Sequence, residues 1–98
     1  MSSSRLTGKT VLVTGASSGI GRSCALEFAR AAPEGLRIIV TARRVEKLEN
    51  LAQEITSYAP NVKVLPVQLD VADPKAVAGF VEGLPEEWRA IDVLVNNA

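Results

Sequence analysis

The feature of the sequence that most constrains its fold is a turn containing three glycines, placed directly after a short apolar run. Residues 10–14 read Thr-Val-Leu-Val-Thr, which is typical of a strand covered on both faces. Glycines follow at positions 15, 19 and 21, and residues 20–32 then have helical apolar spacing, with Ala25, Phe28 and Ala29 on one side. A strand, a glycine turn and a helix in this order predict the start of a β-α-β unit.

The rest of the chain repeats this alternation of apolar runs and amphipathic segments. Further strands are predicted at residues 37–41, 62–67 and 91–95, and further helices at 45–57 and from residue 73 onward, where Asp73 precedes Pro74 as an N-cap. The last helix is expected to bury Val77, Phe80, Val81 and Leu84. This alternation predicts an α/β fold, the first half of a Rossmann-type doubly wound parallel sheet. Because crossovers between parallel strands are right-handed, the expected strand order is 3-2-1-4. Pro66 fits an edge strand in that order.

Length and composition limit the domain organisation and the partners. Ninety-eight residues allow one domain at most. Because the last strand would leave a parallel edge uncovered, we expect residues 1–98 to be the N-terminal part of a single domain. Eleven basic and eleven acidic residues balance, so nucleic acid and anionic membranes are not expected partners. Neither a membrane-spanning run nor a secretory signal is present in the sequence, which makes the cytoplasm the expected location.

The absence of histidine and the single cysteine limit the kinds of site that we expect. Histidine is absent, which removes the commonest general base and metal ligand, and no metal site is expected. The single cysteine, Cys24, lies among apolar neighbours in the first predicted helix and is interpreted as a small core residue.

The glycine turn has the chemistry of a phosphate-binding loop. Gly15 permits a tight turn with positive φ, Gly19 lets a pyrophosphate approach the backbone, and Gly21 lets helix and strand pack closely. Free N–H groups at the helix start would receive the negative charge, and Ser17 and Ser18 can add hydroxyl donors. The alternative is a flexible loop that merely contains glycines, but the strand before it and the helix after it favour phosphate binding.

Three motifs resemble those of the short-chain dehydrogenase/reductase family. Residues 14–21, Thr-Gly-Ala-Ser-Ser-Gly-Ile-Gly, resemble its Thr-Gly-x-x-x-Gly-x-Gly turn, and Asn-Asn-Ala at 96–98 resembles its Asn-Asn-Ala-Gly motif. Leu-Asp-Val at 69–71 falls where the family places its adenine contact, so the resemblance covers essentially the whole chain.

The resemblance implies roles for residues outside the glycines. Asp70 and Val71 would frame the adenine, Asn97 would lie against the ribose and phosphate, and Asn96 would brace the central strand. Ile20, inside the glycine turn, joins the expected cofactor contacts. The alternatives are that Asp70 is a turn or helix-capping residue and that the two asparagines only form a turn.

The end of the second strand decides between the two nicotinamide cofactors. NAD-binding proteins place an acidic residue there to hold the ribose hydroxyls, whereas a nearby arginine suits a 2′-phosphate. Here the acidic position is Ala42, followed by Arg43 and Arg44. We therefore predict NADP, with Arg43 on the 2′-phosphate and Arg44 in support. The alternative is that both arginines are solvated charges, although positive charge at a helix start is unfavourable against the dipole.

By resemblance, the family's chemistry needs a tyrosine and a lysine four residues apart, and residues 1–98 do not hold that pair. The only tyrosine is Tyr58, with Val62 four positions later, so Tyr58 is interpreted as a packing residue and the catalytic part as missing. The resemblance implies an NADP(H)-dependent oxidoreductase acting on a small-molecule alcohol or carbonyl, and a dimer or tetramer when full length. Residues 42–49 and 84–88 are similar to the branch that oxidises serine and other 3-hydroxy acids. The alternative is a truncated nucleotide-binding module without activity. A sugar-nucleotide epimerase fits less well, because its glycines are usually spaced Gly-x-x-Gly-x-x-Gly.

Overall fold

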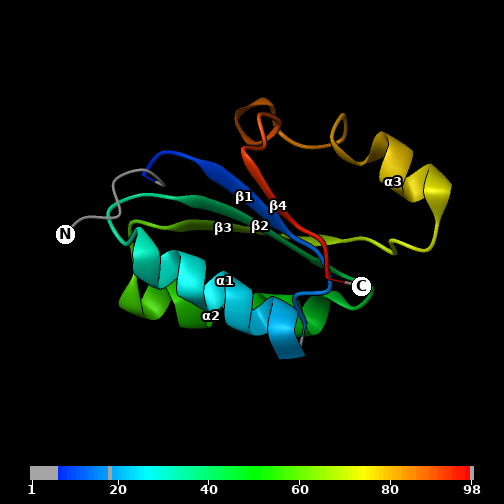
Figure 1. Cartoon of the computed structure of the whole chain (residues 1–98). Coiled ribbons are helices and arrows are strands. Elements are labelled where there is room, and N and C mark those ends of the chain that lie inside the picture. The colour runs from blue at the N-terminus through cyan, green and yellow to red at the C-terminus, as the bar shows by residue number, and fades with distance from the viewer. Residues whose placement is uncertain (1–6, 18, 98) are drawn as a thin grey trace.

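The computed structural model describes residues 7–17 and 19–97, which form a parallel sheet with helices on it (Figure 1). The elements in chain order are β1 (Thr10–Val13), α1 (Gly19–Ala31), β2 (Arg37–Ala42), α2 (Val45–Tyr58), β3 (Lys63–Gln68), α3 (Pro74–Phe80), the 3-10 helix η1 (Glu86–Trp88) and β4 (Val93–Val95). The predicted elements are all present, with boundaries within two residues for the strands.

The strands lie in the order β3-β2-β1-β4, and all three pairings are parallel, which confirms the predicted topology. In register, Val11 of β1 pairs with Ile38 of β2 on one side and with Val93 of β4 on the other. Pro66 lies in β3, an edge strand, as expected. Because the strands are parallel, the segments that follow them all begin at the same edge of the sheet.

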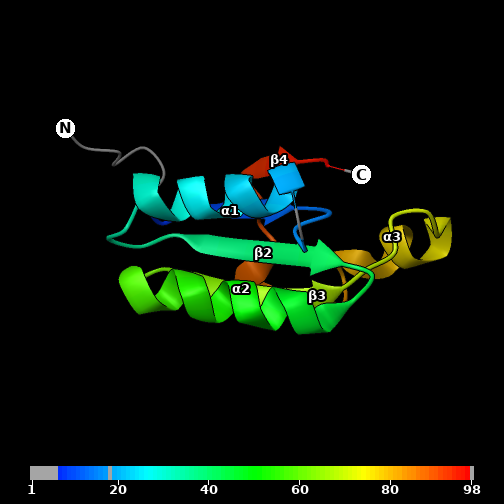
Figure 2. The same cartoon turned by 90° about the horizontal axis from the view of Figure 1, so that it is seen from below.

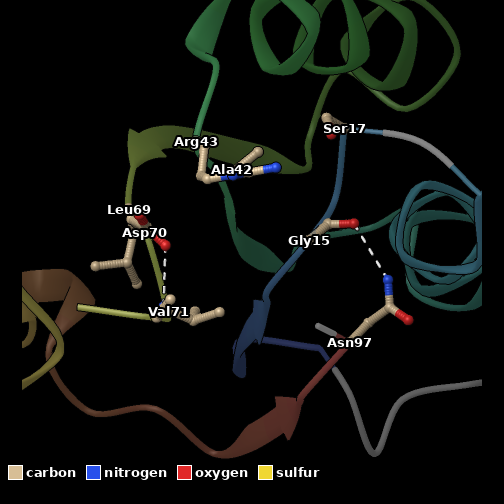
Figure 3. Close-up of a pocket in the computed structure, with 9 residues that line it drawn as sticks. Gly15, Ser17, Ala42, Arg43, Leu69, Asp70, Val71 and Asn97 are labelled. Atoms are coloured by element: carbon tan, nitrogen blue, oxygen red, sulfur yellow. Dashed lines mark hydrogen bonds between the residues drawn. The ribbon is translucent and has the colours of Figure 1, made fainter. Parts of the chain in front are cut away.

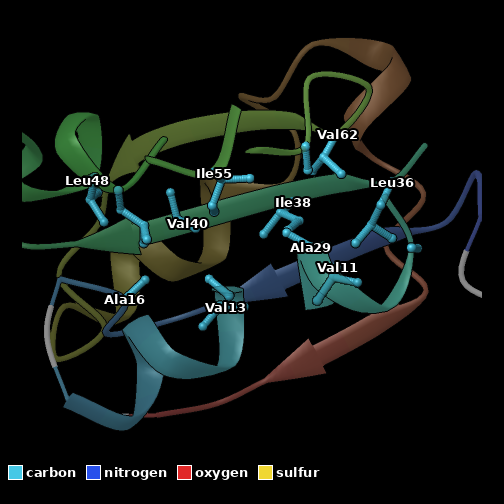
Figure 4. Close-up of a cluster of buried hydrophobic side chains, with 14 of the residues drawn as sticks. Val11, Val13, Ala16, Ala29, Leu36, Ile38, Val40, Leu48, Ile55 and Val62 are labelled. Atoms are coloured by element: carbon cyan, nitrogen blue, oxygen red, sulfur yellow. The ribbon is translucent and has the colours of Figure 1, made fainter. Parts of the chain in front are cut away.

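The main hydrophobic core lies between the sheet and the helices α1 and α2, which cover the same face (Figure 2). Figure 4 shows Val40 of β2 beside Leu48 and Ile55 of α2, whereas Val13 of β1 lies toward α1. The predicted period of α2 is confirmed, since Leu48, Leu51 and Ile55 are all buried. Burying each such side chain stabilises the fold by about 1.5–3 kcal/mol.

A smaller core on the opposite face corrects the prediction for the last helix. Leu84 and Trp88 cover Leu12 and Ile39 there, but Val77 and Val81 are 45% and 40% exposed. The prediction that these two valines are buried was wrong. α3 ends at Phe80 and lies out to the side of the sheet (Figure 1), so that Phe80 is partly buried against this smaller core while Val77 and Val81 stay exposed.

Two local predictions have clear outcomes. The N-cap of α3 is confirmed, because the Asp73 carboxylate accepts hydrogen bonds from the N–H groups of Lys75 and Ala76. Cys24 is half-buried at the margin of the main core, so its interpretation as a core residue is only partly right. Among the described residues, every helix is too short or too polar to cross a bilayer.

Candidate functional site

A cleft of about 390 Å³ opens at the edge of the sheet where the strands end. Its walls come from the segments that follow β1, β2, β3 and β4 (Figure 3), namely Gly15, Ser17, Ala42, Arg43, Leu69, Asp70, Val71, Ala72 and Asn97. Ligands of open α/β sheets bind at this edge. The structure therefore brings together predicted site residues that lie up to 82 positions apart in the sequence.

Not every predicted residue lines this cleft. Gly19, Ile20 and Gly21 belong to the first turn of α1 beside it, and Arg44 lines a neighbouring hollow. Ser18 lies outside the described residues.

The backbone of the glycine turn has the conformation that its sequence predicts. Gly15 has a φ of 62°, and a Cβ there would lie 2.0 Å from the carbonyl oxygen of Asn97. A Cβ at Gly21 would lie 2.2 Å from the carbonyl oxygen of Gly15. The predicted positive φ at Gly15 and the close packing at Gly21 are thus confirmed, and neither position tolerates a side chain.

The beginning of α1 fits an anionic group. Gly19 has a φ of 64°, and a Cβ there would meet no atom within 4 Å, so its outer side is open. Ile20 beside it is 72% exposed. N–H groups of a first helical turn have no partner within the helix and attract negative charge. The open backbone at Gly19 therefore suits a diphosphate.

Thr14 holds the glycine turn against the segment after β4, a role that the sequence analysis did not assign. The side chain is buried, and its hydroxyl oxygen accepts a hydrogen bond of 2.8 Å from the N–H of Asn97. The same hydroxyl lies 3.2 Å from Oδ1 of Asn96, to which it donates, as the bracing role of Asn96 implies. The side-chain amide of Asn97 in turn donates to the carbonyl of Gly15 at 3.2 Å. The only sequence signal was that Thr14 opens the motif.

A second hollow, of about 430 Å³, adjoins the cleft and is lined by Ser17, Arg43, Arg44 and Lys47. Ser17 and Arg43 line both spaces, so the hollow continues from the cleft. Within the part of the chain that the structure describes, none of its three cationic side chains pairs with a carboxylate. The hollow is therefore a positively charged site with room for an anion.

The contribution of Lys47 to this hollow was missed from the sequence, because Arg43 precedes α2 and helical spacing does not relate the two residues. Gln68 at the end of β3 fixes the main chain here, since its side-chain amide donates to the carbonyl of Arg43 at 3.0 Å. Arg44 occupies the N-cap position of α2 without a side-chain hydrogen bond to the helix.

The remaining polar residues have structural contacts of their own. The Asp70 carboxylate accepts a hydrogen bond of 2.9 Å from the N–H of Ala72, as expected of a turn residue, which was the alternative interpretation. Asp70 also lines the cleft. Its adenine contact stays a prediction. The hydroxyl of Tyr58 donates to the carbonyl of Leu26, and the guanidinium of Arg30 lies 6.0 Å from its ring centre, which agrees with a packing role.

Comparison with known proteins places this geometry in a family. Residues 9–98 match the short chain dehydrogenase family. The chain is 52% identical over 95 residues to the NADP-dependent 3-hydroxy acid dehydrogenase of Schizosaccharomyces pombe, covering 97% of this chain and 36% of that protein. It is 42% identical to human retinol dehydrogenase 11, over 96% of this chain and 29% of that one.

A solved structure agrees with the sequence comparisons. L-sorbose reductase from Gluconobacter frateurii, complexed with NADPH and L-sorbose, superposes with a TM-score of 0.82 at 38% identity, over 95% of this chain and 34% of its own. The chain thus spans about a third of the length of these relatives. It belongs to the short chain dehydrogenase family.

Proposed function

We propose that residues 1–98 are the N-terminal part of a single NADP-binding Rossmann domain, in an oxidoreductase that transfers hydride between NADP(H) and an alcohol or carbonyl. Residues of the cleft and the hollow would hold the cofactor, and the catalytic residues would lie outside residues 1–98. The proposal draws on relatives that are about three times as long as this chain.

The observation that carries the proposal is the continuity between the glycine turn and the cationic hollow. The open backbone at Gly19 suits a diphosphate, and the adjoining hollow offers Arg43 and Arg44 directly after Ala42, the position at which an NAD-binding protein would present a carboxylate. Ser17 and Arg43 line both spaces, so one ligand could extend from the cleft into the hollow. A dinucleotide with an added phosphate on its adenosine ribose matches this charge pattern.

A 3-hydroxy acid such as serine is the substrate we favour, because the relative from Schizosaccharomyces pombe is named for that class. A retinol dehydrogenase and a sorbose reductase are also similar to this chain, at 42% and 38% identity. We favour the 3-hydroxy acid class because the identity to its enzyme is higher, at 52%. We also propose a homo-oligomer, dimer or tetramer, which the family resemblance implies, and a cytoplasmic location, which a single cysteine fits. The second candidate is a nucleotide-binding module without turnover.

The test uses the full-length protein, its Arg43→Ala variant, and Arg30→Ala as a matched control on the far end of α1. Binding of NADPH and NADH is measured by fluorescence titration, and turnover with NADP and serine by absorbance. Arg43→Ala should weaken NADPH binding by about 1–3 kcal/mol, the range for a hydrogen bond to a charged group, and leave NADH nearly unchanged. Equal losses for both cofactors would contradict the assignment. Binding of the cofactor without turnover of serine would favour the second candidate, a nucleotide-binding module.

A further inference from the structure

The cationic hollow contains one more charge than the proposed phosphate contact requires. Arg43 and Arg44 follow β2, and Lys47 reaches the same hollow from the first turn of α2. All three side chains belong to exposed residues, so each could instead have extended into solvent away from its neighbours. The end of β2 and the first turn of α2 bring all three to one concave space.

Charge alone opposes this arrangement. Three like charges around one hollow repel each other, and the positive end of the α2 dipole lies beside them. Glu46 is in the same helical turn, but among the described residues it forms no ion pair with any of the three. An anion in the hollow would remove the repulsion. A phosphate monoester carries between one and a half and two negative charges at neutral pH, roughly enough to engage two cations at once.

We propose that Lys47 is a specificity-determining residue that binds the 2′-phosphate of NADP together with Arg43. This inference rests on the proposed function. Arginine presents a planar fork that can bind two phosphate oxygens, whereas the lysine ammonium is a compact charge on a flexible stem that can reach a third. Lys47 therefore distinguishes NADP from NAD by its charge, and Arg43 does so by its charge and by the geometry of its guanidinium group.

The experiment uses the full-length protein with Lys47→Met, which keeps an unbranched side chain of nearly the same length and removes its charge. Lys47→Arg is the conservative variant, and Lys75→Met, in the first turn of α3 outside both spaces, is the matched control. Dissociation constants are measured for NADPH and NADH and, by competition, for 2′-AMP and 5′-AMP. Thermal unfolding checks that each variant is folded.

Lys47→Met should raise the dissociation constants of NADPH and 2′-AMP about two- to fivefold, as for an exposed charge pair, and leave those of NADH and 5′-AMP unchanged. The loss should shrink as salt is added, because salt screens an exposed pair. Lys47→Arg should restore most of the affinity, and Lys75→Met should match the unmodified protein.

Three results would contradict the role of Lys47, and only the third would also contradict the proposed function. If Lys47→Met leaves NADPH binding unchanged while Arg43→Ala weakens it, Lys47 is no part of the site and the proposed function stands. If Lys47→Met weakens all four ligands equally, its role is structural. If neither Lys47→Met nor Arg43→Ala weakens the binding of 2′-AMP more than that of 5′-AMP, the assignment of NADP as the cofactor is contradicted as well.

Discussion

Alanine substitutions in the glycine turn separate two physical reasons for a glycine, backbone conformation and close approach. Gly15 has both, because its φ is 62° and its Cβ would lie 2.0 Å from the carbonyl oxygen of Asn97. Gly19 has only the positive φ, with open space around it. Gly21 has only the close approach, 2.2 Å from a carbonyl oxygen, and Gly35 has neither.

These differences set the expected losses in the free energy of unfolding. A left-handed conformation costs a residue with a side chain about 1–2 kcal/mol, which is the loss expected for Gly19→Ala. Crowding a well-packed contact costs about 1–3 kcal/mol, which is the loss expected for Gly21→Ala because the nearest atom is a backbone carbonyl oxygen. Gly15→Ala should combine the two and lose about 2–5 kcal/mol. Gly35→Ala, the control, should change stability by less than about 0.5 kcal/mol.

Urea unfolding of the full-length variants, followed by circular dichroism, measures all four free energies. The order of the losses is the decisive result. If Gly19→Ala is as damaging as Gly15→Ala, the approach of the segment after β4 to the turn contributes nothing. If Gly21→Ala is as mild as Gly35→Ala, helix α1 does not pack on the turn as described.

Two other substitutions test the contacts around the site and the core. Thr14→Val keeps the shape of the side chain but leaves the partly buried N–H of Asn97 without its acceptor, and should cost about 1–3 kcal/mol in urea unfolding and speed hydrogen exchange at that N–H. Thr14→Ser, which keeps the hydroxyl, should lose less, and an equal loss would show that packing alone matters. Leu48→Ala removes a fully buried side chain between α2 and the sheet and should cost about 2–5 kcal/mol, whereas a loss under 1 kcal/mol would refute its place in the core.

Much of the fold could be predicted because local patterns and topology agree. The apolar runs locate the strands, the period of α2 identifies Leu48, Leu51 and Ile55 as buried, and right-handed crossovers leave the order 3-2-1-4 as the natural choice. The φ of Gly15 followed from the turn itself.

The errors share one physical cause, which is that a sequence pattern shows which residues share a face but not what lies opposite that face. Val77 and Val81 have helical spacing, yet α3 lies beside the sheet and leaves them exposed. Cys24 has apolar neighbours along the helix, but it sits at the margin of the core. The hollow around Lys47 and the contacts of Thr14 likewise depend on where distant segments meet.

The hydrogen bond between Thr14 and Asn97 also sets the order in which the cleft can form during synthesis. The two residues are 83 positions apart, so a nascent chain that already contains the turn, α1 and β2 still lacks the wall that β4 delivers. Contacts between segments far apart in the sequence form more slowly during folding than the local contacts of a helix. The cleft should therefore gain its last wall only once residues 93–97 have left the ribosomal tunnel, and a shorter nascent chain lacks that wall.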